Sequence, residues 1–352
     1  SECYGNPDAL HQAGRKAGQL MEASREKIAS LLGVQKEEVL FCGSASEANT
    51  LALIGYALAN KDRGNHILIS NVEHPSVDHC RQPLTDLGFE VEYLPVHPDG
   101  RVHPDDVKKK MRKETILVSC MHVNNEVGSI NPVREIAEVV HQHPVCAFHC
   151  DCVQSFSKID VPFRHLDLAT ISAHKIHGLK GSALLIKKKN CRLKPVIQGG
   201  QQEQGYRGGT QNAPVNIVLA KTIRLALENQ SGTYQQVKEI NDYIRKELQS
   251  IPGSVIHSPK EGLPHILNIG FDSMTSEVLL NALDSKGICV SAKSTCSSHS
   301  SDESAVLIAM GKSHKEATHM IRLSFGADNT MEQAQCFIQC LKEILDSYGL
   351  SI

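Results

Sequence analysis

The stretch Asp167-Leu-Ala-Thr-Ile-Ser172-Ala-His174-Lys175-Ile-His-Gly178 joins a short apolar run to a polar loop. The run 168–171 has the length and composition of a buried strand, and the loop after it carries Lys175. Ligands bind at the carboxyl ends of strands in open α/β sheets. A lysine at that edge can form a Schiff base, although a single loop lysine is more often an ordinary surface residue.

Similar apolar runs alternate with helical patterns along most of the chain. They cover residues 39–41, 66–70, 91–95, 116–120, 147–150 and 183–186, and helical periodicity covers 10–32 and 47–59. Strands separated by helices of ten or more residues predict a mostly parallel sheet. A long helix over 234–250 then opens a smaller α+β region, with candidate strands at 265–269 and 288–291.

Length and composition limit the classes of protein to which this chain can belong. Its 352 residues exceed the roughly 250–300 that one core usually holds, so we expect two domains. A net charge of -2 and a pI near 6.8 argue against a nucleic-acid partner. No apolar run approaches the ~20 residues of a membrane span. We expect a soluble cytoplasmic protein. The sequence begins at Ser1 without Met. If a targeting segment has been removed, an organelle is an alternative location.

The twelve cysteines are scattered and form no Cys-x-x-Cys pair. This distribution is typical of a reducing compartment, and it predicts neither a disulfide framework nor a metal site.

Polar residues stand at the ends of other predicted strands. Asp151 follows the run 147–150, Gln154 comes three residues later, and either Asn124 or Asn125 can contribute from beyond the run 116–120. A carboxylate at such a position can hold a pyridine nitrogen protonated. The turn Ser44-Ala45-Ser46 precedes a helix and can bind a phosphate, or can serve only as an N-cap.

The chain resembles the cysteine desulfurases, which are class V aminotransferases of pyridoxal-phosphate (PLP) fold type I. The resemblance runs from residue 4 almost to the C-terminus. It rests on Gly5-Asn-Pro7, Gly43 to Asn49, Val72-Glu-His74, Met121 to Gly128, Asp151 with Gln154, Ser172-Ala-His-Lys175, Gly199 to Glu203, Tyr206 to Thr210, and Ile321 to Gly326. It implies an α/β fold whose large domain holds a mostly parallel seven-stranded sheet between helices. We expect this domain over 13–230 and a small α+β domain over 231–352, on which residues 1–12 pack.

The resemblance also implies the residues that hold the cofactor. Lys175 would bind PLP covalently and move a proton, and His74 would stack on the ring and act as an acid or base. Asp151 would pair with the ring nitrogen, while Gln154 and Asn125 would steady the ring and the substrate. The phosphate would be held by Ala45, Ser46, Ser172, His174 and, from the other subunit of a homodimer, Thr210.

The same resemblance implies the reaction. Arg322 would bind the carboxylate of L-cysteine. Cys296, in the polar run Ser291 to Ser300, would take the substrate sulfur as a persulfide and release L-alanine. The sulfur would then pass to an acceptor or scaffold protein for iron–sulfur cluster or thio-cofactor assembly. Without the family resemblance, a cysteine among serines is more often a thiol that has no catalytic role.

Three other interpretations remain, and one of them is a class V aminotransferase, which would need no mobile cysteine. A selenocysteine lyase or a cysteine C–S lyase would use the same scaffold, and the elimination catalysed by the latter would not need Cys296. A protein that keeps the PLP fold without turnover would serve as a scaffold or regulatory partner.

Overall fold

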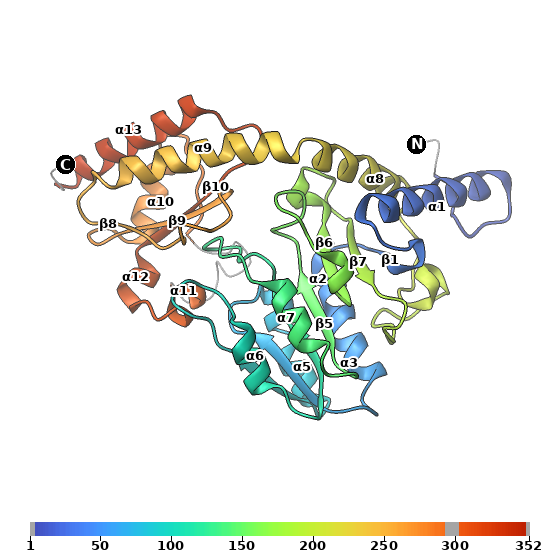
Figure 1. Ribbon diagram of the computed structural model, residues 1–352. Helices are drawn as coiled ribbons and strands as arrows, with labels where there is room; N and C mark the ends of the chain where they lie inside the picture. The colour runs from blue at the N-terminus through green and yellow to red at the C-terminus, as the bar shows by residue number, and fades with distance from the viewer. Residues whose placement is uncertain (1–3, 293–302, 350–352) are drawn as a thin grey trace. The chain divides into compact units, whose positions relative to one another are not determined.

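A seven-stranded mixed sheet forms the centre of the N-terminal part of the molecule. The computed structural model describes residues 4–292 and 303–349, and within them this sheet has the order β1-β7-β6-β5-β4-β2-β3 (Figure 1). Its strands are β1 (Val39–Cys42), β2 (His66–Ser70), β3 (Glu90–Leu94), β4 (Thr115–Ser119), β5 (Ala147–Asp151), β6 (Leu168–Ser172) and β7 (Ala183–Lys187). Strands β3, β2, β4, β5 and β6 run parallel, and β7 is antiparallel to β6 and β1. The predicted mostly parallel α/β fold is confirmed.

Burial explains why the strands read as continuous apolar runs. Every residue of β2, β4, β5, β6 and β7 is buried, as expected for a parallel sheet that is covered on both faces. The edge strand β3 instead has Glu90 exposed and Glu92 half-buried. The polar loops at the strand ends are therefore held by a rigid, buried framework.

Helices surround this sheet. The first, α1 (Gln12–Leu32), ends where Gly33 adopts a left-handed conformation (φ 66°) and donates to the Ala29 carbonyl, as the sequence predicts. It runs beside α8 (Ala213–Glu228) (Figure 1). The predicted helix over 47–59 is a continuous helical run of α2 (Ala45–Thr50), a π-helical turn (Leu51–Gly55) and α3 (Tyr56–Ala59). Shorter helices are α4 (Pro75–Asp78), α5 (Arg81–Asp86), α6 (Pro104–Lys110) and α7 (Val133–Val140).

The C-terminal part has its own sheet and core. Strands β8 (Ser254–Ile256), β9 (Ile266–Phe271) and β10 (Met320–Ser324) form an antiparallel sheet of order β10-β9-β8. Helix α9 (Gln230–Leu248) runs beside α13 (Met331–Ser347), and their apolar faces share a core with β9 and β10 (Figure 1). The remaining described helices are α10 (Ser276–Asp284), α11 (Ala305–Ala309) and α12 (His314–Thr318).

The strand predicted at 288–291 is wrong. Only Ser291 makes a bridge, to Arg322, while the Ile288 N–H bonds to the Leu283 carbonyl and so ends α10 instead of extending a sheet. The short strand β8 was not predicted, because its three half-buried residues give no periodic signal.

Contacts divide the chain into two units. The first comprises Ser1–Leu94, Val102–His122 and Asn131–Asn229, and the second comprises Pro95–Arg101, Val123–Ile130 and Gln230–Ile352. This grouping differs from the expected domains in two respects. Two segments from the first half of the chain belong to the second unit, and the described residues before α1 group with the first unit, where Asp8 accepts a hydrogen bond from Gln202.

Over the described ranges 4–292 and 303–349, we find no helix with both the length and the apolar character that a membrane crossing requires.

Candidate active site

The carboxyl ends of three parallel strands of the first unit, and the loops that follow them, carry the central candidate residues. Asp151 is the last residue of β5, and Ser172 is the last residue of β6. Lys175 lies in the 3₁₀ turn Ala173–Ile176 that follows β6, and His74 lies four residues beyond β2. Because β2, β4, β5 and β6 are parallel, their carboxyl ends share one edge of the sheet. The fold therefore brings these side chains to that edge.

Asp151 is a buried carboxylate with defined donors. It is 4% exposed and accepts hydrogen bonds from Asn49 Nδ2 at 2.9 Å and from the Val153 N–H at 2.9 Å. Burial raises the pKa of Asp151, whereas these donors and the positive charges of His74 and Lys175 act in the opposite direction. Such a carboxylate is suited to pairing with a cation that is brought to it.

His74 is held through one ring nitrogen. Its Nδ1 lies 2.8 Å from Ser76 Oγ and accepts from the Ser76 N–H at 3.1 Å, which caps the N-terminus of α4. Burial lowers the pKa of His74, and the charge of Lys175 lowers it further against the opposing effect of Asp151. Both effects favour the neutral form of the imidazole.

Lys175 is an exposed residue whose positive charge acts on the ionisable groups around it. It is among the causes that shift the pKa values of His74, Asp151 and His174. It acts in the same way on Lys158, whose pKa is lowered to about 8 chiefly by burial and then by the charge of Lys175. The Lys158 Nζ donates to the Gln154 carbonyl at 3.0 Å. The amines of Lys158 and Lys175 therefore lie near enough to each other to interact electrostatically.

Hydrogen-bond donors for an anion lie in two places on the same unit. Ser44, not Ser46, caps α2 by accepting from the Glu47 N–H at 3.1 Å, and the first N–H groups of the helix, those of Ala45 and Ser46, have no acceptor within it. Ser172 Oγ lies 2.8 Å from His174 Nδ1 after β6. Hydroxyl, imidazole and helix N–H groups of this kind are suited to a phosphate.

Two candidates of this unit have less defined surroundings. The side chain of Gln154 is half-buried one turn beyond β5. Thr210 is exposed at the end of the loop that follows residue 199. The roles that the family resemblance implies for Gln154 and Thr210 stay predictions.

The second unit holds the other two described candidates. Arg322 on β10 donates from Nη1 to the Asn125 carbonyl at 2.9 Å, and burial lowers its pKa. Among the described residues its Nε has no hydrogen-bond partner. Cys296 lies outside the described residues, as do the neighbouring Lys293 and His299.

Sequence reasoning missed four residues of the first site. Asn49 and Ser76 link Asp151 to His74, because Asn49 Nδ2 donates both to Asp151 and, at 2.8 Å, to Ser76 Oγ. Glu73 and Lys158 are the others, and both have pKa values shifted by burial. A polar Asn inside a helix was the one available signal, since Asn favours caps over helix interiors.

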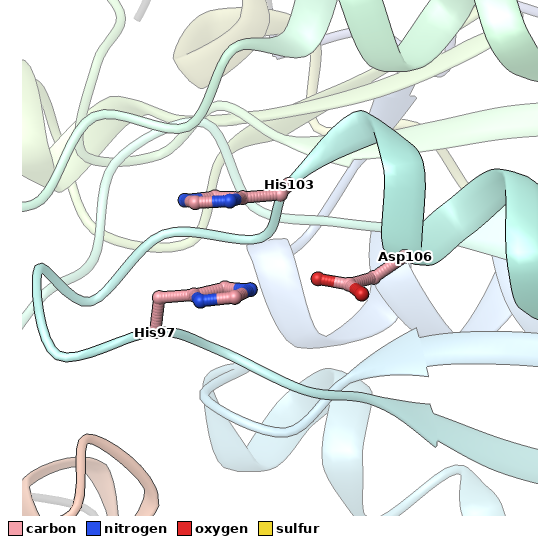
Figure 2. Close-up of side chains that lie close together, drawn as sticks. All are labelled: His97, His103 and Asp106. Atoms are coloured by element: carbon pink, nitrogen blue, oxygen red, sulfur yellow. The ribbon is translucent and has the colours of Figure 1, made fainter.

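Among the described residues, a further group of metal-ligating side chains lies in the loop after β3 and the first turn of α6. Figure 2 shows His97, His103 and Asp106, whose ligand atoms lie within 4.8 Å of one another. These residues take no part in the site described above.

Comparisons with known proteins agree with the resemblance seen in the sequence. The pattern of the family described as aminotransferase class-V matches residues 1–337. A NifS/IcsS protein homolog of Lactobacillus delbrueckii is 39% identical, covering 99% of this chain and 92% of that protein. Cysteine desulfurase IscS of Dictyoglomus turgidum is 37% identical, covering 98% and 88%.

Solved structures show the same likeness. A NifS-like protein superposes with a TM-score of 0.91 at 34% identity, covering 98% of this chain and 93% of its own. A second, from Rickettsia africae, gives a TM-score of 0.86 at 30% identity, covering 97% and 92%. The match over nearly the whole length, together with the lysine, aspartate and histidine at one sheet edge, shows that this chain belongs to the class V aminotransferase family.

Proposed function

We propose that this chain is a PLP-dependent cysteine desulfurase, which converts L-cysteine into L-alanine and leaves a persulfide on Cys296. The observation that carries the proposal is the position of Lys175 beside Asp151 and His74, in a chain whose relatives are named cysteine desulfurases. Lysine supplies the amine that binds such a cofactor, and the buried carboxylate supplies its counter-charge.

The residues present fit PLP. Asp151 would pair with the pyridine nitrogen, since a buried carboxylate gains most from a cationic partner. The N–H groups of Ala45 and Ser46, with Ser172 and His174, would bind the phosphate. When bound, PLP withdraws electrons from the substrate Cα and makes its proton acidic.

The chain's own groups would then carry out the transfer. Arg322 would bind the substrate carboxylate, with Asn125 beside it, and Lys175 Nζ would take the Cα proton. The Cys296 thiolate would form an S–S bond with the substrate sulfur as the substrate C–S bond breaks. The substrate Cβ would receive a proton, so that cysteine and a thiol give alanine and a persulfide.

We propose further that the enzyme is a homodimer that passes its sulfur to an acceptor protein. Thr210 is exposed, as a residue that reaches the partner's phosphate must be, and the first unit also exposes large apolar side chains at Val196, Ile197, Val218 and Leu225. Burial of these side chains against a second subunit would stabilise such a dimer. Sedimentation of the purified chain would measure its oligomeric state.

One experiment tests the central proposal. The purified chain is loaded with PLP and mixed with cysteine, and alanine and the mass of the peptide that contains residue 296 are followed over one turnover. We expect one alanine per persulfide on Cys296 in the wild type and in a Cys289→Ser control, and no persulfide there in Cys296→Ser. Sulfide release at the full rate by Cys296→Ser would show a C–S lyase instead. If none of the three proteins turned over cysteine, the result would favour a scaffold or regulatory protein that keeps the PLP fold without catalysis.

A further inference from the structure

A chain of hydrogen bonds leads from the carboxylate of Asp151 to one nitrogen of His74. Asn49 Nδ2 donates to Asp151 Oδ2 at 2.9 Å and to Ser76 Oγ at 2.8 Å. Ser76 Oγ in turn lies 2.8 Å from His74 Nδ1. Asp151 is 4% exposed and Asn49 is fully buried, so water does not compete for these contacts at the carboxylate end.

The direction of each hydrogen bond follows from the chemistry of the groups. An ionised carboxylate only accepts, so the amide of Asn49 must present its NH₂ group to Asp151. The second hydrogen of that NH₂ group is donated to Ser76 Oγ, which is therefore an acceptor there. The hydroxyl hydrogen of Ser76 is left to point at His74 Nδ1.

A second donor acts on the same ring nitrogen. The backbone N–H of Ser76 is donated to His74 Nδ1 at 3.1 Å, and an N–H group has no other role than to donate. Two donors directed at one nitrogen exclude a proton on that nitrogen. In the neutral ring the proton must then lie on Nε2.

We infer that Asn49 and Ser76 are positioning residues that hold His74 as the Nε2–H tautomer, so that in the resting protein its free nitrogen presents a hydrogen-bond donor. The tautomer follows from the contacts alone, whereas its use in turnover rests on the proposed function. Histidine at this site then begins a reaction by donating from Nε2, as neutral imidazoles do in other enzymes. A proton on Nδ1 would remove the cap of α4 and the acceptor for Ser76.

The groups that face His74 are consistent with a neutral ring. Asp151 favours a positive imidazole, but burial, Lys175 and His79 oppose it. Asn49 and Ser76 stand between the carboxylate and the ring in a chain of three hydrogen bonds. Asp151 thereby orients His74 without taking a proton from it.

The test is a measurement of the tautomer by nitrogen NMR on the PLP-loaded full-length protein with ¹⁵N-labelled histidine. A His74→Gln variant identifies the signals of residue 74 among the 18 histidines of the chain. We expect the wild type to show a protonated Nε2 and an unprotonated Nδ1. In Ser76→Ala, which keeps the backbone donor and loses the hydroxyl, the ratio of Nε2–H to Nδ1–H should fall roughly five- to tenfold, the effect of one neutral hydrogen bond.

Two variants make the result specific. Ser76→Thr keeps a hydroxyl at the same position and should restore the wild-type ratio. Thr115→Val removes the hydroxyl that lies 2.7 Å from Nδ1 of the remote His66, and should alter the His66 signals while leaving those of His74 unchanged.

A wild-type ring protonated on Nδ1 would overturn the inference, and an unchanged ratio in Ser76→Ala would overturn the role of Ser76. Neither readout needs turnover. If the protein has the Nε2–H tautomer but does not make alanine from cysteine, the proposed function is wrong and the inference about the tautomer still holds.

Discussion

Arg25 on α1 and Glu203, 178 residues later, form a bidentate ion pair inside the first unit. Arg25 Nη1 and Nη2 donate to the two carboxylate oxygens at 2.8 and 3.0 Å, and the two side chains are 6% and 1% exposed. Glu203 also accepts from the Phe41 N–H at 2.9 Å. The pair therefore ties the loop before Thr210 to α1 and β1.

The backbone at this loop is strained, and the ion pair holds it in place. Glu203 and Gln204 both have left-handed conformations, with φ values of 46° and 59°. Non-glycine residues in this region cost about 1–3 kcal/mol each and persist only where their surroundings fix them. A fork of two parallel hydrogen bonds is a contact that an arginine makes and a lysine does not.

We predict that Arg25→Met lowers the free energy of unfolding by about 3–5 kcal/mol, because it leaves the Glu203 carboxylate buried without its cation. Arg25→Lys should fall between the wild type and Arg25→Met. Urea denaturation measures the change. The control is Lys36→Met, which removes an exposed pair with Glu26 and should cost less than about 1 kcal/mol. Equal losses in Arg25→Met and Lys36→Met would contradict the prediction.

The burial of the Glu73 carboxyl group should make the stability of the fold depend on pH. Its Oε1 accepts from Ser70 Oγ at 2.5 Å and from the Met121 N–H at 2.6 Å, and its Oε2 has no partner in the described part of the chain. Burial raises the pKa of Glu73 to about 8, above the ordinary value of 4.5. Between these two values the folded chain binds more protons than the unfolded one, so the contribution of Glu73 to stability falls as the pH rises.

Glu73→Gln mimics the neutral acid and should remove this dependence. Relative to the wild type, the variant should gain on the order of 1–3 kcal/mol between pH 5 and pH 8. Urea midpoints of both proteins at the two pH values measure the difference. A constant difference at both would mean that Glu73 is ionised throughout.

Lys175→Ala should abolish covalent attachment of PLP. The visible absorbance of the bound cofactor should disappear, borohydride should no longer fix PLP to the chain, and the rate should fall by roughly 10²–10⁴-fold or more, as expected when a positioned acid or base is lost. Lys189→Ala, at an exposed lysine beyond β7, should keep both the spectrum and the rate. Borohydride labelling of another lysine in the wild type would reassign the site.

Arg322→Lys should weaken recognition of the substrate carboxylate. Loss of a charge-assisted fork should lower kcat/KM for cysteine by roughly 10–100-fold. Cysteamine, which lacks the carboxylate, serves as the matched control, and its kcat/KM should be nearly the same in both proteins. If the variant loses as much with cysteamine as with cysteine, then Arg322 supports the structure and does not bind the carboxylate.

Much of the fold was predictable because a buried parallel strand needs apolar side chains at nearly every position. The runs at 66–70 and 168–171 are therefore recognisable in the sequence. Gly33 marks the end of α1, because glycine adopts the left-handed backbone conformation found there without strain. The run 288–291 is apolar too, but Ile288 bonds to the end of α10 and does not join a sheet. Apolar composition cannot distinguish these two outcomes.

The sequence by itself determined the strand ends at which Lys175, Asp151 and Ser172 stand, since local patterns mark where each buried run stops. It did not determine which polar groups from elsewhere meet them. Asn49, Ser76 and Asp151 belong to three separate segments, and only the packing of α2 against α4 and the sheet brings them within hydrogen-bond distance. Arg25 and Glu203 likewise meet only after folding, because a hydrogen bond depends on distance in space and leaves no spacing rule along the chain.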